Sequence, residues 1–153
     1  MANTFTQLYI QFVFAVQGRA NLIGKPHKEE LHKYISGIVE KRNHKMLAIN
    51  CMPDHIHIFI GMKPVQSISD LVRDIKTNSS TFITEHKLVK SKFNWQEGYG
   101  AFSYSHSHID AVVKYVLKQE EHHHKETFKE EYLNFLKAFD IKYDEKYLFE
   151  WIG

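Results

Sequence analysis

The segment CMPDHIHIFIGM, Cys51–Met62, combines the composition of a buried strand with two histidines placed two residues apart. Side chains alternate between the two faces of a strand, so His55 and His57 share one face. The opposite face carries three isoleucines that can pack beneath a helix, namely Ile56, Ile58 and Ile60. The segment therefore predicts a strand with one apolar face and one face that carries paired imidazoles.

The rest of the chain places this strand in a sheet. HKMLAINCM (44–52) predicts a preceding strand, and Pro53 with Asp54 predicts the tight turn of a hairpin. Hydrophobic patterns predict further elements, in chain order: a strand over 8–16, helices over 25–42 and 67–89, a strand over 101–105, and helices over 108–124 and 128–139. The order βαββαβ predicts an α+β, ferredoxin-like fold, an antiparallel sheet with helices on one face plus C-terminal helices.

The composition indicates one globular domain, residues 1–153, because 43% of the residues are hydrophobic and no linker or repeat is visible. No apolar run reaches the length of a membrane span, so no membrane partner is expected. A single cysteine agrees with a reducing cytoplasm. The net charge of +2 is too small to indicate nucleic acid by itself, so a local basic surface would be needed.

Two imidazoles on one face of a stiff strand form part of a metal site, although an isolated H-x-H pattern also arises by chance as exposed residues without a role. The predicted helix over 108–124 offers a third ligand, because Tyr115 and Gln119 lie one turn apart at the edge of its apolar stripe. If this helix docks beside the hairpin, His55, His57 and Gln119 converge on a cation next to Tyr115. Otherwise Tyr115 is a core-edge aromatic and Gln119 a solvated residue.

A divalent cation with imidazole and oxygen ligands suits phosphoryl chemistry, because it withdraws charge from a phosphate oxygen and holds the phosphate for attack. A tyrosine hydroxyl has a pKa of about 10, so it needs such help, or a base, to attack near neutral pH. The product would be a phosphotyrosine ester, which conserves the bond energy for a later rejoining step.

Several motifs resemble those of a known family. HIH at 55–57 is similar to the His-hydrophobe-His motif of HUH endonucleases. YVLKQEEHH at 115–123 resembles the tyrosine helix of the single-tyrosine HUH transposases of small bacterial insertion sequences, the IS200-like transposases. Similar blocks follow the expected order over nearly the whole chain: MPDHIH (52–57), LVRDIKTNSSTFI (71–83) and FNWQEGYGAFSYS (93–105).

This resemblance implies that His55, His57 and Gln119 bind Mg²⁺ or Mn²⁺ and that Tyr115 is the nucleophile. The family cleaves single-stranded DNA with hairpin ends, leaving a 5′-phosphotyrosine and a free 3′-OH, and then joins new ends. It also implies a homodimer formed by edge-to-edge joining of the two sheets, in the cytoplasm of a bacterium or archaeon. The sequence leaves open whether each active site is assembled in cis or in trans.

Residues near Gln119 are alternative third ligands: Glu120, Glu121, His122 and His123. His122 falls on the same flank of the helix as Tyr115, where it is a candidate proton shuttle or ligand. His123 lies closer to the apolar stripe and is expected to be structural. HHH at 122–124 does not itself predict a zinc site, because consecutive helical residues point about 100° apart.

Candidate DNA contacts lie on the second and third predicted helices. Arg73, Lys76 and Asn78 are near the start of a polar run, and such groups contact phosphates without reading the sequence. In the family the corresponding helix helps to hold a DNA hairpin, which favours Arg73 and Lys76. A solvated helix face is the alternative. Lys114 and Lys118 flank the tyrosine, where they are placed to attract the scissile phosphate.

The main hypothesis is thus a metal-dependent transposase that acts on single-stranded DNA through Tyr115. A domesticated palindrome-specific nickase would share this chemistry. A non-catalytic nucleic-acid-binding module of the same fold would tolerate His55→Ala without loss of any activity. A zinc hydrolase would use water as its nucleophile and would leave no protein–DNA adduct.

Overall fold

The computed structural model describes residues 3–123 and 125–152. Its sheet has the strand order β2-β3-β1-β4, with every neighbouring pair antiparallel: β1 (Tyr9–Ala15), β2 (Lys45–Cys51), β3 (His55–Gly61) and β4 (Gly100–Tyr104). The helices are α1 (Lys28–Lys41), α2 (Ile68–Glu85), α3 (Ile109–Leu117), α4 (Gln119–His122) and α5 (Phe128–Ala138). The predicted α+β, ferredoxin-like arrangement is confirmed.

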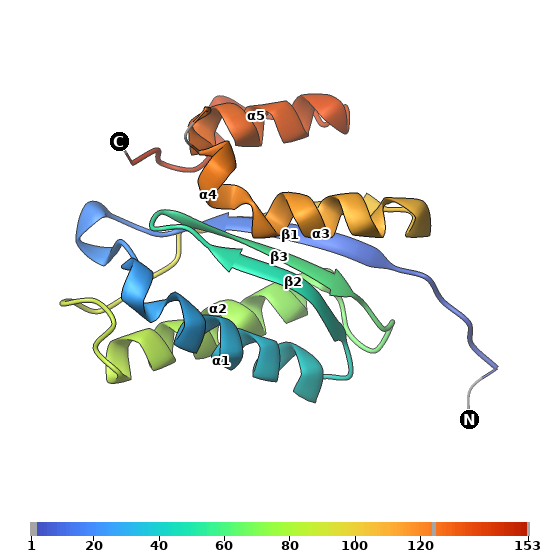
Figure 1. Ribbon diagram of the computed structural model, residues 1–153, viewed down its shortest axis with the longest axis horizontal. Helices are drawn as coiled ribbons and strands as arrows, with labels where there is room; N and C mark the ends of the chain where they lie inside the picture. Colours follow the sequence, from blue (N-terminus) through green and yellow to red (C-terminus); the bar gives the residue numbers. More distant parts are fainter. Residues whose placement is uncertain (1–2, 124, 153) are drawn as a thin grey trace.

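Helices α1 and α2 cover one face of the sheet, and α3 and α5 lie over the opposite side (Figure 1). The three isoleucines of β3 face α1 and α2 and belong to the main core with Leu31, Ile35, Leu71 and Ile75, all fully buried. Because side chains alternate along a strand, the same β3 residues that build this core force the histidines onto the α3–α5 side.

Aromatic and aliphatic side chains attach the C-terminal helices to this second face. Val112 and Val116 of α3 pack on Ala48 and Phe59 in a separate small core. Phe135 of α5 stacks on Phe102 of β4, with ring centroids 4.9 Å apart. The two helices thus cover different strands of one face, and they enclose the histidine pair between them.

The helix predicted over 108–124 is interrupted at Lys118, which has φ −100° and ψ 25°. Asn50 explains the interruption, because its side-chain amide donates to the Val116 and Leu117 carbonyl oxygens at 3.0 and 3.4 Å. Those carbonyls would otherwise accept from the next helical turn. The break also corrects the predicted apolar stripe, since Leu117 is exposed.

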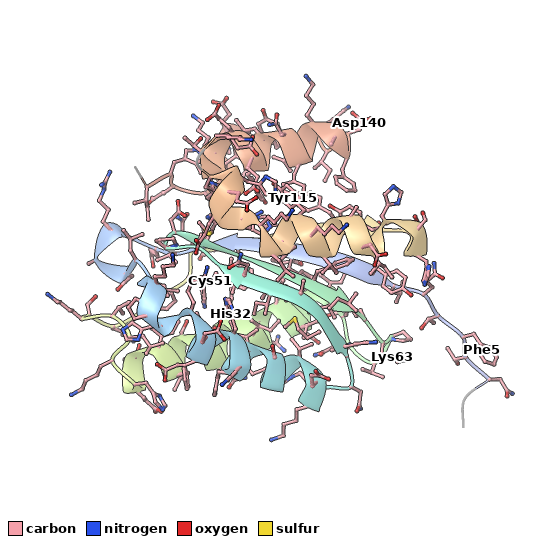
Figure 2. All side chains as sticks on the ribbon, in the orientation of Figure 1. Phe5, His32, Cys51, Lys63, Tyr115 and Asp140 are labelled. Atoms are coloured by element: carbon pink, nitrogen blue, oxygen red, sulfur yellow. The ribbon has the colours of Figure 1, made fainter. Side chains whose placement is uncertain are left out.

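The C-terminal segment docks mainly through aromatic rings. Helix α5 begins with a capping box between Thr127 and Glu130. Phe149 and Trp151, which follow this helix near the C-terminus, pack against Phe128. The N-terminal segment does not dock in this way: Phe5 is exposed and lies on an extended stretch before β1 that leads away from the sheet (Figure 2). Among residues 3–123 and 125–152, no helix has the length and apolar character that a membrane crossing requires.

Candidate metal and tyrosine site

The histidine pair of β3 is completely enclosed. His55 is 1% exposed and His57 is 0% exposed, so they are not the exposed strand histidines of the chance alternative. His55 also stacks face to face on Phe128, with ring centroids 3.9 Å apart. Buried imidazoles need polar partners, and α5 supplies one.

That partner is Glu131, a buried carboxylate at the centre of the site. Its Oε1 atom lies 3.0 Å from His57 Nε2, 3.1 Å from His123 Nε2 and 3.6 Å from His55 Nε2. Burial disfavours the charged carboxylate, but the surrounding imidazoles outweigh burial and hold the pKa of Glu131 well below its usual range. The surrounding imidazoles therefore favour the ionised form of this carboxylate.

Four of these side chains fit a divalent metal ion. Ligand atoms of His55, His57, His123 and Glu131 all lie within 4.8 Å of one another. Imidazole and carboxylate ligands suit a divalent transition metal. Within the described residues, His55 Nε2 is buried without a hydrogen-bond partner, so it has a lone pair or proton that nothing in the chain uses.

The hydrogen bonds of His57 give a second argument for a cation. Its Nδ1 faces Gln11 Oε1 at 2.7 Å and its Nε2 faces Glu131 Oε1 at 3.0 Å, and both oxygens are acceptors. A neutral imidazole has only one N–H. With the proton on Nδ1, the Nε2 lone pair faces the carboxylate, an arrangement that a bound cation would stabilise.

Gln119, the third ligand expected from the sequence, lies beside this group and is fully buried. Its Nε2 donates to Glu131 Oε2 at 3.1 Å, and its Oε1 accepts from His123 Nε2 at 3.0 Å. The amide thus bridges two members of the histidine–glutamate group.

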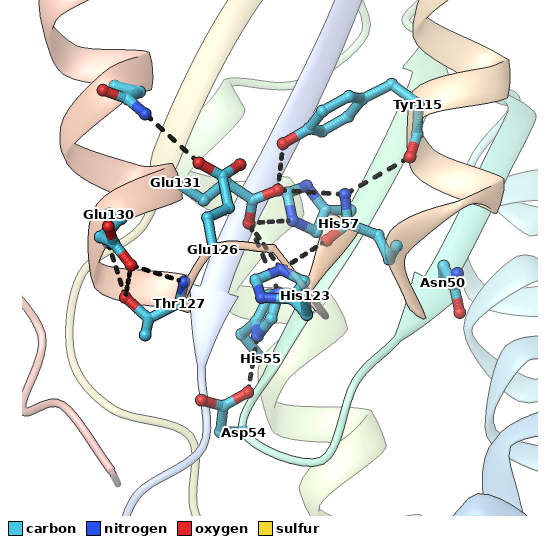
Figure 3. A network of polar contacts seen from close by, with 12 residues as sticks. Asn50, Asp54, His55, His57, Tyr115, His123, Glu126, Thr127, Glu130 and Glu131 are labelled. Atoms are coloured by element: carbon cyan, nitrogen blue, oxygen red, sulfur yellow. Dashed lines mark hydrogen bonds and ion pairs between the residues drawn. The ribbon is translucent and has the colours of Figure 1, made fainter. Parts of the chain in front are cut away.

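Tyr115 extends from α3 toward Glu131, which extends from α5 (Figure 3). The tyrosine hydroxyl donates a hydrogen bond to Glu131 Oε2. Burial, together with the negative charge of Glu131, raises the pKa of Tyr115. The Tyr115 ring is 6.0 Å from the His57 ring and stacks on His122 at 4.5 Å. His122 is therefore a neighbour of the tyrosine, as its helical position suggested.

Two members of the group were missed or given another role from the sequence. His123 was expected to be structural, yet its ring nitrogen faces Glu131. The sequence prediction does not include Glu131, although the sequence carries a signal for it. In the predicted helix over 128–139 it follows Phe128 by three residues and precedes Phe135 by four, which places a carboxylate within an apolar stripe.

The candidate DNA contacts lie in different settings. Arg73 is exposed and pairs with Asp70 at 3.2 Å, and Asn78 donates to the Asp74 carbonyl oxygen. Lys76 donates to the carbonyl oxygens of Gln96 and Gly98, and burial lowers its pKa to about 8. Lys76 therefore fastens α2 to the loop before β4. Lys114 and Lys118 are exposed near the tyrosine.

The histidine pair, the tyrosine and the glutamine all fall in a segment that matches a known family. The family described as "Transposase IS200 like" matches residues 4–119. This chain belongs to that family. The match includes His55, His57, Tyr115 and Gln119 but ends before His123 and Glu131, so α5 adds its carboxylate from outside the matched residues.

Similar proteins agree with this assignment. The ISDra2 transposase TnpA of Deinococcus radiodurans is 23% identical over 118 residues, which cover 74% of this chain and 84% of that protein. A crystal structure assigned to a transposase of Deinococcus radiodurans R1 superposes with a TM-score of 0.62 at 18% identity, covering 78% of this chain and 95% of that one. The structure of a REP-associated tyrosine transposase bound to a REP hairpin superposes with a TM-score of 0.58 at 16% identity, covering 80% of this chain and 73% of that one. Both structures share the fold.

We expect Phe128→Ala to lower the free energy of unfolding by about 3–5 kcal/mol, the usual cost of deleting a buried phenylalanine ring. Phe128 joins α5 to His55, Phe149 and Trp151, so its removal loosens the helix that supplies Glu131. Urea unfolding followed by circular dichroism measures the change. Lys129 is a neighbouring exposed residue, and the free energy of unfolding of Lys129→Ala should stay within about 0.5 kcal/mol of that of the unaltered chain. Equal losses for both variants would contradict this role of Phe128.

Proposed function

We propose that this transposase cleaves and rejoins single-stranded DNA at insertion-sequence ends, with Tyr115 as its nucleophile. The observation that supports the proposal most strongly is the convergence of the Tyr115 hydroxyl, the two buried β3 histidines and Gln119 on one enclosed point. A tyrosine whose only role was packing at a core edge would not need its hydroxyl directed at such a cluster.

The metal that the proposal requires is Mg²⁺ or Mn²⁺. His55 and His57 would hold it, with Gln119, Glu131 and His123 as the further candidate ligands. When bound, the cation supplies charge neutralisation at the phosphate and lowers the barrier to nucleophilic attack.

The chain itself positions the nucleophile. Packing against His57 and His122 fixes the Tyr115 ring, so that its oxygen stays directed at the site. In cleavage this oxygen forms a bond to phosphorus while the bond from phosphorus to the 3′ oxygen breaks. The phenolic proton passes to water, and the departing 3′ oxygen takes up a proton. The reverse reaction joins a 3′-OH to the phosphotyrosine and releases the tyrosine.

We propose that the Glu131 side chain moves away from Tyr115 when DNA binds. Its carboxylate accepts the hydrogen bond from Tyr115, so it lies where a phosphate attacked by Tyr115 has to lie. Two anions repel strongly in a buried site. Glu131 must therefore withdraw from the tyrosine before the scissile phosphate arrives.

The surroundings of the site suit a DNA strand. We propose that Lys114 and Lys118, exposed beside Tyr115, attract the scissile phosphate, and that Arg73, Lys76 and Asn78 contact a DNA hairpin. A relative of the same fold was solved with a REP hairpin bound, which supports a hairpin substrate here. Lys76 would have to release its carbonyl partners, so it is the weakest of these candidates.

We also propose a homodimer in the cytoplasm of a bacterium or archaeon, joined through the edges of its two sheets. The edge strands are β2 and β4. The separation of 6.0 Å between the rings of Tyr115 and His57 within one chain favours active sites assembled in cis.

Removing divalent metal should abolish covalent DNA attachment. The test incubates the full chain with a labelled single-stranded oligonucleotide that carries an element end and resolves the products on a denaturing gel. We expect a retarded band with Mg²⁺ or Mn²⁺, no band with EDTA, and recovery when metal is restored. Cleavage without a covalent band would instead support a hydrolase that uses water. A complex on a native gel with neither product would support a non-catalytic binding module.

A further inference from the structure

The outer ring nitrogens of the histidine pair each face an oxygen acceptor. His57 Nδ1 is 2.7 Å from Gln11 Oε1, and His55 Nδ1 is 2.7 Å from Asp54 Oδ1. We propose that Gln11 and Asp54 are positioning residues that keep the protons of His57 and His55 on Nδ1, so that both Nε2 lone pairs face the metal group. The inference rests on the proposed metal-dependent function.

The chemistry of imidazole makes these contacts decisive. A neutral imidazole carries its proton on one nitrogen or the other, and the nitrogen with the proton cannot bind a metal. An acceptor at Nδ1 therefore selects the tautomer whose Nε2 is free. It also fixes the plane of the ring and raises the basicity of the ligand nitrogen.

The sheet holds Gln11 beside His57. Gln11 lies on β1 directly opposite Phe59 of β3 and Phe102 of β4, and it is 1% exposed. Its Nε2 donates to the Tyr104 hydroxyl at 3.0 Å, and its Oε1 is directed at His57. If the amide were reversed, its NH₂ group would face Nδ1 and favour the wrong tautomer. Tyr104 thereby connects edge strand β4 with the metal group.

Asp54 acts through a different geometry. It occupies the turn between β2 and β3 and directly precedes His55 in the chain. The backbone carbonyl oxygen of Asp54 accepts from the Val16 amide at 2.9 Å, which holds the turn against β1. A carboxylate has no proton to donate and can only accept, so it favours the Nδ1–H form of His55. This assigns a role to the aspartate in PDHIH.

Paired variants at each position distinguish the effect of the hydrogen-bond acceptor from the effect of side-chain packing. Gln11→Met keeps the length of the side chain but removes its acceptor, whereas Gln11→Glu keeps an acceptor at His57. Asp54→Ala removes the acceptor, and Asp54→Asn keeps one amide oxygen. Calorimetric titration of each full-length variant with Mn²⁺ should show affinity about 10–100-fold weaker for Gln11→Met and Asp54→Ala. The Mn²⁺ affinities of Gln11→Glu and Asp54→Asn should stay closer to that of the unaltered chain.

The tautomers provide a direct readout that a purely structural role would not change. Long-range ¹⁵N–¹H spectra of the ¹⁵N-histidine-labelled, metal-free chain at pH 8 should show a proton on Nδ1 of both residues. Gln11→Met should lose that proton at His57 and leave His55 unchanged, and Asp54→Ala should do the reverse. Nδ1 nitrogens without a proton in the unaltered chain, or equal Mn²⁺ affinities for all four variants, would overturn the inference. Failure of the unaltered chain to bind Mn²⁺ would instead refute the proposed function, while the spectra still test Gln11 and Asp54.

Discussion

Replacing Tyr115 with phenylalanine should abolish the covalent protein–DNA adduct while leaving the affinity for single-stranded DNA nearly unchanged. The hydroxyl oxygen is the atom proposed to attack phosphorus, and phenylalanine has no substitute for it. The phenyl ring keeps its packing against His57, His122 and Phe135, so the shape of the site is retained. A denaturing gel measures the adduct, and fluorescence anisotropy with a labelled oligonucleotide measures binding.

The folded state should tolerate this change. Glu131 loses one hydrogen-bond donor but keeps contacts to His57, His123 and Gln119, so we expect a stability change of about 1–2 kcal/mol. Tyr99→Phe is the matched control, because it removes a hydroxyl that contacts Ser69 and should leave the adduct intact. If Tyr115→Phe still forms an adduct, mass spectrometry of the labelled peptide would identify the true nucleophile and refute the assignment.

The two residue pairs whose neighbourhood the sequence predicts depend on short-range geometry. The two-residue repeat of a strand places His55 and His57 together, and one helical turn separates Tyr115 from Gln119. The strand relationship holds regardless of how the elements pack, whereas the Tyr115–Gln119 relationship spans the helix break at Lys118 that Asn50 explains. The apolar faces of β3 and α3 then leave few ways to dock them, which is why the meeting of the two pairs is one of the two alternatives that the sequence offers.

The remaining parts depend on contacts between distant segments. Glu131 enters the site only because Phe128 and Phe135 dock α5 over the sheet, and no spacing within α5 specifies that docking position. The break at Lys118 depends on the Asn50 side chain from β2, sixty-six residues before Val116, whose carbonyl it binds. Lys76 has the composition of a DNA contact, but carbonyls of another loop bind its ammonium group.

Replacing Glu131 with glutamine should weaken Mn²⁺ binding in the absence of DNA by at least about tenfold. The substitution preserves size but removes the negative charge that the three imidazoles surround. Loss of an outer partner of a metal ligand already costs about 10–100-fold, and loss of a charged ligand should cost no less. Glu130→Gln is the matched control, because Glu130 is an exposed capping-box residue and glutamine serves the same capping role.

The same substitution should have the opposite effect on covalent attachment once Mn²⁺ is saturating. The Glu131 carboxylate contacts the Tyr115 hydroxyl, so it repels the scissile phosphate from the position that attack requires, and it also raises the pKa of the tyrosine. An amide removes both effects, and adduct should form faster in Glu131→Gln than in the unaltered chain. The rate is read from a time course on denaturing gels at several Mn²⁺ concentrations. Slower adduct formation at saturating Mn²⁺ would show that the carboxylate takes part in the reaction, and unchanged Mn²⁺ affinity would remove Glu131 from the metal group.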